Sequence, residues 1–177
     1  MNTTEQLKSL RDETGVSVMQ CKKALDEAGG DIEKARIILK KKSGDAAAKK
    51  ADRELGAGII VTAQNTDRAV MLTLLCETDF VAKNEDFVNA AKSLAGIALA
   101  GGKSALDNSA EEVNALIQKM GENVKIGDVV VAESTNAAVY NHNGQYASVV
   151  VLKDKNDTLA RDIAMHATAM RPAYLVE

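Results

Sequence analysis

The chain has 177 residues, and its content of 46% apolar and 27% charged residues is typical of globular proteins with a buried core. Its formal net charge of −3 argues against nucleic acid as a partner, because phosphate binding requires a basic face. No apolar run is long enough to span a membrane, and the N-terminal residues lack the apolar segment of a signal peptide. We therefore expect a cytoplasmic location and no membrane partner.

The first 42 residues are predicted to form three short amphipathic helices. Apolar side chains recur there at helical spacing, and glycines interrupt the pattern between the segments. Thr3 with Gln6, and Ser17 with Gln20, have the spacing of a capping box, which marks the start of a helix. Residues 1–42 therefore indicate a three-helix N-terminal module.

The next segment, residues 43–57, is rich in alanine and in charged side chains. It carries no sustained apolar stripe, so it cannot anchor a core of its own. We interpret it as a charged, partly helical linker.

Beyond residue 57 the pattern is typical of a core built from two related halves. Short β-prone runs flank a polar turn and precede two helical segments, and the same order then recurs around Asn143 and Gly144, a strong hairpin signal. The predicted strands are 58–63, 69–76, 128–133, 137–142 and 146–152, and the predicted helices are 88–99, 108–120 and 158–170. The sequence thus predicts an α+β fold, in which the three-helix bundle precedes two diverged antiparallel-sheet and helix repeats at 58–122 and 123–177.

The last predicted helix has an apolar face with helical spacing. His166 shares this face, so we expect a hydrogen-bonded histidine in the core. The face consists of Ile163, Ala164, Ala167 and Met170.

The two halves differ in length between a strand and the helix that follows it. Aligning residues 71–75 with 148–152 gives an offset of 77, whereas aligning 90–100 with 159–169 gives 69. The first half therefore carries eight additional residues in the stretch CETDFVAKNEDF at 76–87. A strand-to-helix connection needs only a few residues, so this excess indicates an exposed loop with a role beyond joining the two elements.

Two interpretations of Phe80 within this stretch remain open from the residues alone. In one, the ring folds back as a lid on its own aliphatic core and Asp79 only caps the following helix. In the other, Asp79 and Phe80 project into a partner, where a buried ring contributes about 2–4 kcal/mol of binding free energy.

The stretch CETDFVAKNEDF resembles a characteristic segment of the bacterial elongation factor Ts family. Residues 10–35 are similar to that family's N-terminal three-helix motif of ubiquitin-associated type, and MGENVKI and DIAMHATAMRP resemble further family segments in the same order. The family often continues with a helical hairpin and a final module where this chain ends in RPAYLVE, so we expect a short or C-terminally truncated form.

The resemblance implies a guanine-nucleotide exchange factor for elongation factor Tu, which is not an enzyme and needs no cofactor or metal of its own. In the family, the residues corresponding to Asp79 and Phe80 wedge between two helices of the partner's nucleotide domain and dislodge its Mg²⁺. Thr78 and Val81 complete the motif.

The resemblance also implies further partner contacts, whose residues allow other interpretations. Val18 lies on an apolar helix stripe, which favours a core position, and Arg11 and Lys22 fit a solvated surface. His142 stands beside a tight turn, where we expect it to be exposed. The implied contact residues are Arg11, Val18, Met19, Lys22, Met120, Gly121 and His142.

Other classes of function explain less of the chain. The segment GIALAGGKS at 96–104 approaches a phosphate loop, but Ile97 stands where that motif requires glycine, so we interpret it as a helix end. Cys21 and Cys76 belong to no CxxC motif and to no cysteine and histidine cluster, which predicts two buried thiols rather than a nucleophile. The basic runs lack aromatic residues for stacking on bases. A peptide- or protein-binding adaptor of ubiquitin-associated type remains the alternative, although it uses only the first module.

Overall fold

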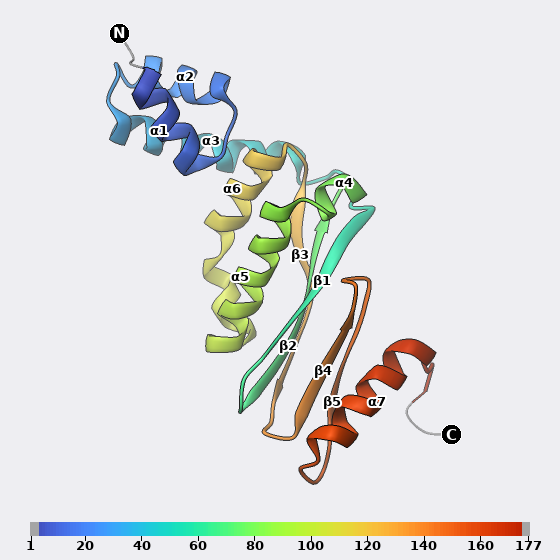
Figure 1. Ribbon diagram of the computed structural model, residues 1–177. Coiled ribbons are helices and arrows are strands. Elements are labelled where there is room, and N and C mark those ends of the chain that lie inside the picture. The colour runs from blue at the N-terminus through green and yellow to red at the C-terminus, as the bar shows by residue number, and fades with distance from the viewer. Residues whose placement is uncertain (1–3, 175–177) are drawn as a thin grey trace. The chain divides into compact units, whose positions relative to one another are not determined.

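The computed structural model describes residues 4–174, and Thr3 with its predicted capping box lies outside them. The chain divides into two compact units, which are described separately. One unit contains the residues up to Glu54 together with Ala110–Val124, and the other contains Leu55–Ser109 and the residues from Lys125 onward. The fold is α+β, with helices and two small antiparallel sheets, as the sequence predicts (Figure 1).

The first unit begins with the three predicted helices, α1 (Thr4–Thr14), α2 (Val18–Glu27) and α3 (Ile32–Lys50). The capping box is present at the start of α2, where Ser17 Oγ accepts a hydrogen bond from the Gln20 backbone N–H and the Gln20 side chain bonds back to Ser17. The small core between the helices is aliphatic, as expected from a chain with 3% aromatic residues. It contains Leu10, Val16, Cys21, Ala24, Leu25, Ala35 and Leu39.

Helix α3 continues beyond the predicted end of the three-helix module. Residues 43–50, which the sequence assigns to the partly helical linker, form its second half, since alanine and lysine favour the helical backbone. Helix α6 (Ala110–Met120) packs against α3, and Lys40 Nζ lies 2.8 Å from Glu111 Oε2. The contact places α6 in the first unit, whereas its position in the chain suggests the first core repeat.

The second unit holds two antiparallel hairpins, each covered by a helix. Strands β1 (Ala57–Gln64) and β2 (Arg68–Cys76) pair with Ala57 opposite Cys76, and α5 (Glu85–Gly101) lies along them (Figure 1). Strands β4 (Ala137–His142) and β5 (Tyr146–Val151) pair with Ala137 opposite Val151, and α7 (Asp157–Met170) packs on both. Asn143 and Gly144 have φ values of 54° and 72°, as the predicted tight turn requires. Both predicted hairpins are therefore confirmed.

Strand β3 (Val124–Glu133) does not join the hairpin that follows it in the chain. It extends the first sheet, whose strand order is β1-β2-β3, and leaves β4 and β5 as a two-stranded sheet. Gly127 permits this close pairing, because a Cβ atom there would lie 3.1 Å from Leu75 Cδ1 on β2. The first strand of the repeat predicted at 123–177 thus pairs with the sheet of the first hairpin.

The core of the second unit lies between the first sheet and α5. Phe87 is fully buried there among aliphatic side chains, and Cys76 is a buried thiol, as is Cys21 in the first unit. Gly102 ends α5 with a φ of 78°, so the segment that resembles a phosphate loop is a helix end followed by the short 3₁₀ helix η1 (Lys103–Asn108).

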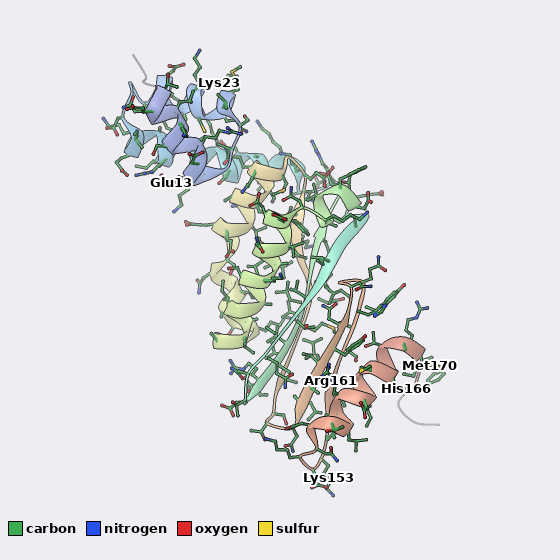
Figure 2. All side chains as sticks on the ribbon, in the orientation of Figure 1. Glu13, Lys23, Lys153, Arg161, His166 and Met170 are labelled. Atoms are coloured by element: carbon green, nitrogen blue, oxygen red, sulfur yellow. The ribbon has the colours of Figure 1, made fainter. Side chains whose placement is uncertain are left out.

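Helix α7 packs through a face that overlaps only in part with the one predicted: Ala164 is buried and Ala167 half-buried, whereas Ile163 and Met170 are exposed. Its buried side chains are Ala160, Ala164 and Thr168, and these small residues allow a close approach, in which Ser148 Oγ of β5 donates to the Ala164 carbonyl over 2.7 Å. His166 is exposed, so its assignment to the core is wrong, and Met170 is 67% exposed (Figure 2). Among residues 4–174, no helix combines the length and the apolar character that a bilayer span requires.

Candidate functional site

The additional residues of the first half form a short, capped helix. Helix α4 (Asp79–Ala82) lies between β2 and α5, and Thr78 Oγ1 accepts a hydrogen bond from the Val81 backbone N–H at its start. Asn84 caps the following helix, because its Oδ1 accepts from the Asp86 N–H over 2.9 Å. The interpretation of Asp79 as the cap of that following helix is therefore wrong.

Two contacts anchor α4 to the body of the second unit. The Cys76 thiol donates to the Thr78 carbonyl over 3.2 Å, which ties the end of β2 to the cap. Ala82 is buried, and α4 packs on β1 and β2. The extra segment thus has a defined backbone and is supported from the strand side.

Phe80 points away from this support. Its side chain is 83% exposed, whereas Phe87, seven residues later, is fully buried. Leaving such a ring in water forgoes about 1.5–3 kcal/mol that burial would contribute to folding. The interpretation of Phe80 as a lid on its own core is wrong, and the ring is available to a partner.

Asp79 lies next to the exposed ring and is held by an ion pair. Lys83 Nζ donates to Asp79 Oδ2 over 2.7 Å across one turn of helix. This hydrogen bond, together with the positive charge, lowers the pKa of the Asp79 carboxyl below its ordinary value. Both side chains are exposed, so the pair orients the carboxylate and adds little to stability.

Replacing Lys83 with methionine is expected to raise the pKa of Asp79 toward its ordinary value, because the donor and the charge are both removed. A lowered pKa stabilises the folded chain above the unfolded-state pKa, and this stabilisation is lost as pH falls through the folded-state pKa. The thermal midpoint at neutral pH should therefore barely change, since the pair is solvated. A pH titration of the Asp79 carboxyl carbon by NMR measures the shift, and Lys92→Met on α5 is the control. An unmoved Asp79 titration in Lys83→Met would contradict this assignment.

Of the remaining predicted contact residues, His142 lies in the second unit and the others lie in the first. In the first unit, Val18 is 47% exposed, so its alternative assignment to the core is wrong; Met19 and Lys22 are exposed beside it on α2. Cys21, Ala24 and Leu25 form the buried face of that helix instead. Arg11 is exposed in the last turn of α1, Met120 is half-buried at the end of α6, and Gly121 follows it with a φ of 78°.

In the second unit, His142 is exposed at the end of β4, as the sequence predicts. The Tyr140 hydroxyl lies 3.3 Å from His142 Nδ1, and the two rings stack with their centroids 6.3 Å apart. Neither Tyr140 nor the neighbouring Asn141 is singled out by the sequence patterns. The available signal was an asparagine three residues before the turn glycine, a spacing at which its side chain can bond to the turn backbone.

No group of three or more histidine, cysteine, aspartate or glutamate side chains within residues 4–174 is arranged to hold a metal ion. The arrangement around α4 offers an exposed apolar ring, an oriented carboxylate and a firm backbone. Such an arrangement is suited to inserting into another protein.

Comparison with known proteins places this segment inside a defined family profile. Residues 77–177 match the family described as Elongation factor TS, a range that includes α4. The chain is 40% identical over 181 residues to an elongation factor Ts of Acinetobacter baumannii, covering 96% of this chain and 62% of that protein. It is 38% identical over 184 residues to one of Psychrobacter arcticus, covering 98% and 63%. The chain thus spans less than two thirds of the length of these curated relatives.

Proposed function

Because the chain belongs to the elongation factor Ts family, we propose that it is a guanine-nucleotide exchange factor that accelerates the release of GDP from elongation factor Tu. The observation that carries the proposal is the exposure of Phe80 on a capped helix that is anchored from behind. A ring that is exposed on a firm support loses little entropy on binding, so more of its burial free energy remains for affinity.

The proposed first step is insertion of Phe80 between two helices of the partner's nucleotide domain. Burying the ring there would contribute about 2–4 kcal/mol, enough to offset a small displacement of one helix. Thr78 and Val81 set the backbone from which the ring projects, since the Val81 N–H donates to Thr78 Oγ1. Asp79 brings its carboxylate to the same place, already oriented by Lys83.

The proposed second step is the loss of the partner's Mg²⁺. In nucleotide-binding proteins of this kind, Mg²⁺ bridges the phosphates and a hydroxyl of the phosphate loop, and it neutralises their charge. Displacing the helix that supports the ion removes this neutralisation, so the diphosphate leaves more readily. No covalent bond breaks, which makes the chain an exchange factor without a cofactor of its own rather than an enzyme.

The coupling between the chain and the nucleotide is reciprocal. If the chain weakens GDP binding by some factor, GDP must weaken binding of the chain by the same factor. Rebinding of nucleotide therefore releases the chain, and the chain can act repeatedly.

The first unit is proposed to supply a second, independent contact with the partner. Its exposed residues on α1 and α2, together with the end of α6, would bind the partner and raise the local concentration of the second unit. We propose that residues 1–42 are a module of ubiquitin-associated type and that 58–122 and 123–177 are diverged repeats, since each repeat contributes a hairpin covered by a helix. In the first unit the proposed contact residues are Arg11, Val18, Met19, Lys22, Met120 and Gly121. In the second unit, His142 is proposed to contact elongation factor Tu as well.

Stopped-flow fluorescence tests the proposal directly. Purified elongation factor Tu is loaded with a fluorescent GDP analogue and mixed with excess unlabelled GDP, with and without the chain. The expected result is a release rate that rises with the concentration of the chain and then saturates. A release rate equal to the spontaneous one at every concentration of folded chain would end the proposal.

A further inference from the structure

A closed ring of three hydrogen bonds ties the turn after β4 to strand β1. The Ile60 N–H donates to the Gly144 carbonyl over 2.7 Å, and the Gly144 N–H donates to Asn141 Oδ1 over 2.8 Å. Asn141 Nδ2 then donates to the Ile60 carbonyl over 2.8 Å and closes the ring. The Asn141 amide and the Gly144 carbonyl together bond both backbone groups of Ile60, as a residue of a neighbouring strand would.

This turn lies directly on β1. A Cβ atom at Gly144 would stand 2.7 Å from Ile59 Cγ1, and the φ of Gly144 is positive, so only glycine fits there without strain. The turn is one of several points at which β1 and β4 approach each other, although the two strands belong to different sheets and share no ladder. A groove of about 500 Å³, lined in part by Gln64 and residues 137–141, borders β4.

The ring of hydrogen bonds requires both the carbonyl oxygen and the NH₂ group of the Asn141 side chain. The carbonyl oxygen accepts from the turn, and the NH₂ group donates to β1. An aspartate in its place could still accept from the Gly144 N–H but could not donate to the Ile60 carbonyl. Asn141→Asp would therefore remove one of the two bonds between the turn and β1, and would leave the bond from the Ile60 N–H to the Gly144 carbonyl and the bond within the turn.

Strand β1 also supports α4, which packs on it. The helix that carries Phe80 and the turn that carries His142 are thus attached to the same strand. We propose that Asn141 is a positioning residue that holds the His142 turn on β1, so that His142 and Phe80 meet the partner at a fixed spacing. This inference rests on the proposed function, in which both residues contact elongation factor Tu.

The test compares two isosteric variants that each remove one amide donor. Asn141→Asp removes the bond to Ile60, and Gln64→Glu removes the matched bond from Gln64 Nε2 to the Ala137 carbonyl, which is 2.8 Å long and lies at the other end of β4. We expect Asn141→Asp to raise the concentration of chain needed for half-maximal GDP release by roughly threefold to tenfold, the effect of one lost hydrogen bond. Gln64→Glu should leave that concentration unchanged.

A double-mutant cycle with His142→Ala separates positioning from general stability. If Asn141 acts through His142, Asn141→Asp should have little further effect once His142 is alanine. Amide NMR shifts of residues 142–144 provide an independent readout of the turn, and circular dichroism selects a temperature at which every variant is folded. Additive effects in the cycle, equal effects of Asn141→Asp and Gln64→Glu, or no effect of His142→Ala would each overturn the inference. Failure of the proposed function is distinct, because the unmodified chain would then not accelerate GDP release.

Discussion

Replacing Phe80 with alanine is expected to remove most of the acceleration of GDP release while leaving the fold intact. The ring is 83% exposed, so its removal creates no cavity and costs little stability. In the proposed complex the same ring is buried, and losing about 2–4 kcal/mol of contact lowers the exchange efficiency roughly 30-fold to 1,000-fold. Stopped-flow release of a fluorescent GDP analogue measures this efficiency, and thermal unfolding by circular dichroism measures the stability.

The chain offers a matched control for this variant. Tyr174 is an aromatic residue of the same unit and is 84% exposed, yet it has no proposed role in exchange. Tyr174→Ala should therefore leave both the exchange efficiency and the thermal midpoint unchanged. Asp79→Ala should reduce exchange more mildly than Phe80→Ala, because it removes a solvated carboxylate rather than a hot-spot ring. Full exchange activity in Phe80→Ala would show that insertion of the Phe80 ring into the partner does not drive the release of GDP.

Sequence patterns predicted the features of this fold that depend on neighbouring residues. The capping box at Ser17 follows from a residue three positions later, Gln20, and the turn at Asn143 and Gly144 follows from the backbone conformations that those residues tolerate. The short β-prone runs on either side of a polar turn likewise indicated the hairpin of β1 and β2. Each of these signals lies within a few residues, so the local sequence is sufficient to determine it.

Features that depend on distant partners could not be predicted in this way. The pairing of β3 with β2 and the packing of α6 on α3 join residues far apart in the chain. Helix α7 has two faces with acceptable spacing, and it is the close approach to β5 that selects Ala164 and Thr168 over the bulkier Ile163 and Met170. Periodicity alone does not indicate which face a neighbour will cover.

The candidate site likewise has some features that the local sequence predicts and others that depend on distant residues. The excess length of the segment around Phe80 and the presence of a phenylalanine were visible in the sequence, but two interpretations of the ring were equally compatible with them. Whether a ring is covered depends on the elements that surround it, and here Thr78, Asn84 and the buried Ala82 fix a helix whose outer side carries Phe80. Asn141 was missed because its second partner, Ile60, is 81 residues away.

Replacing Phe87 with alanine should lower the stability of the fold and leave exchange largely intact, which is the opposite of what is expected for Phe80→Ala. Among residues 4–174, Phe87 is the largest side chain that is fully buried. Truncating a buried phenylalanine costs about 3–5 kcal/mol through lost burial and a residual cavity. For a chain of this length the thermal midpoint should fall by about 6–20 °C, measured by circular dichroism at 222 nm.

Phe87→Leu is the matched control for this variant, since it keeps most of the apolar volume and should lose a smaller part of the stability. At a temperature where Phe87→Ala remains folded, its exchange efficiency should approach that of the unmodified chain, because the cap at Thr78 and the anchor at Ala82 still hold α4 in place. In that case Phe87 contributes mainly to stability and Phe80 mainly to exchange. A folded Phe87→Ala that loses exchange as completely as Phe80→Ala would instead show that α4 depends on the core beneath α5 for its position.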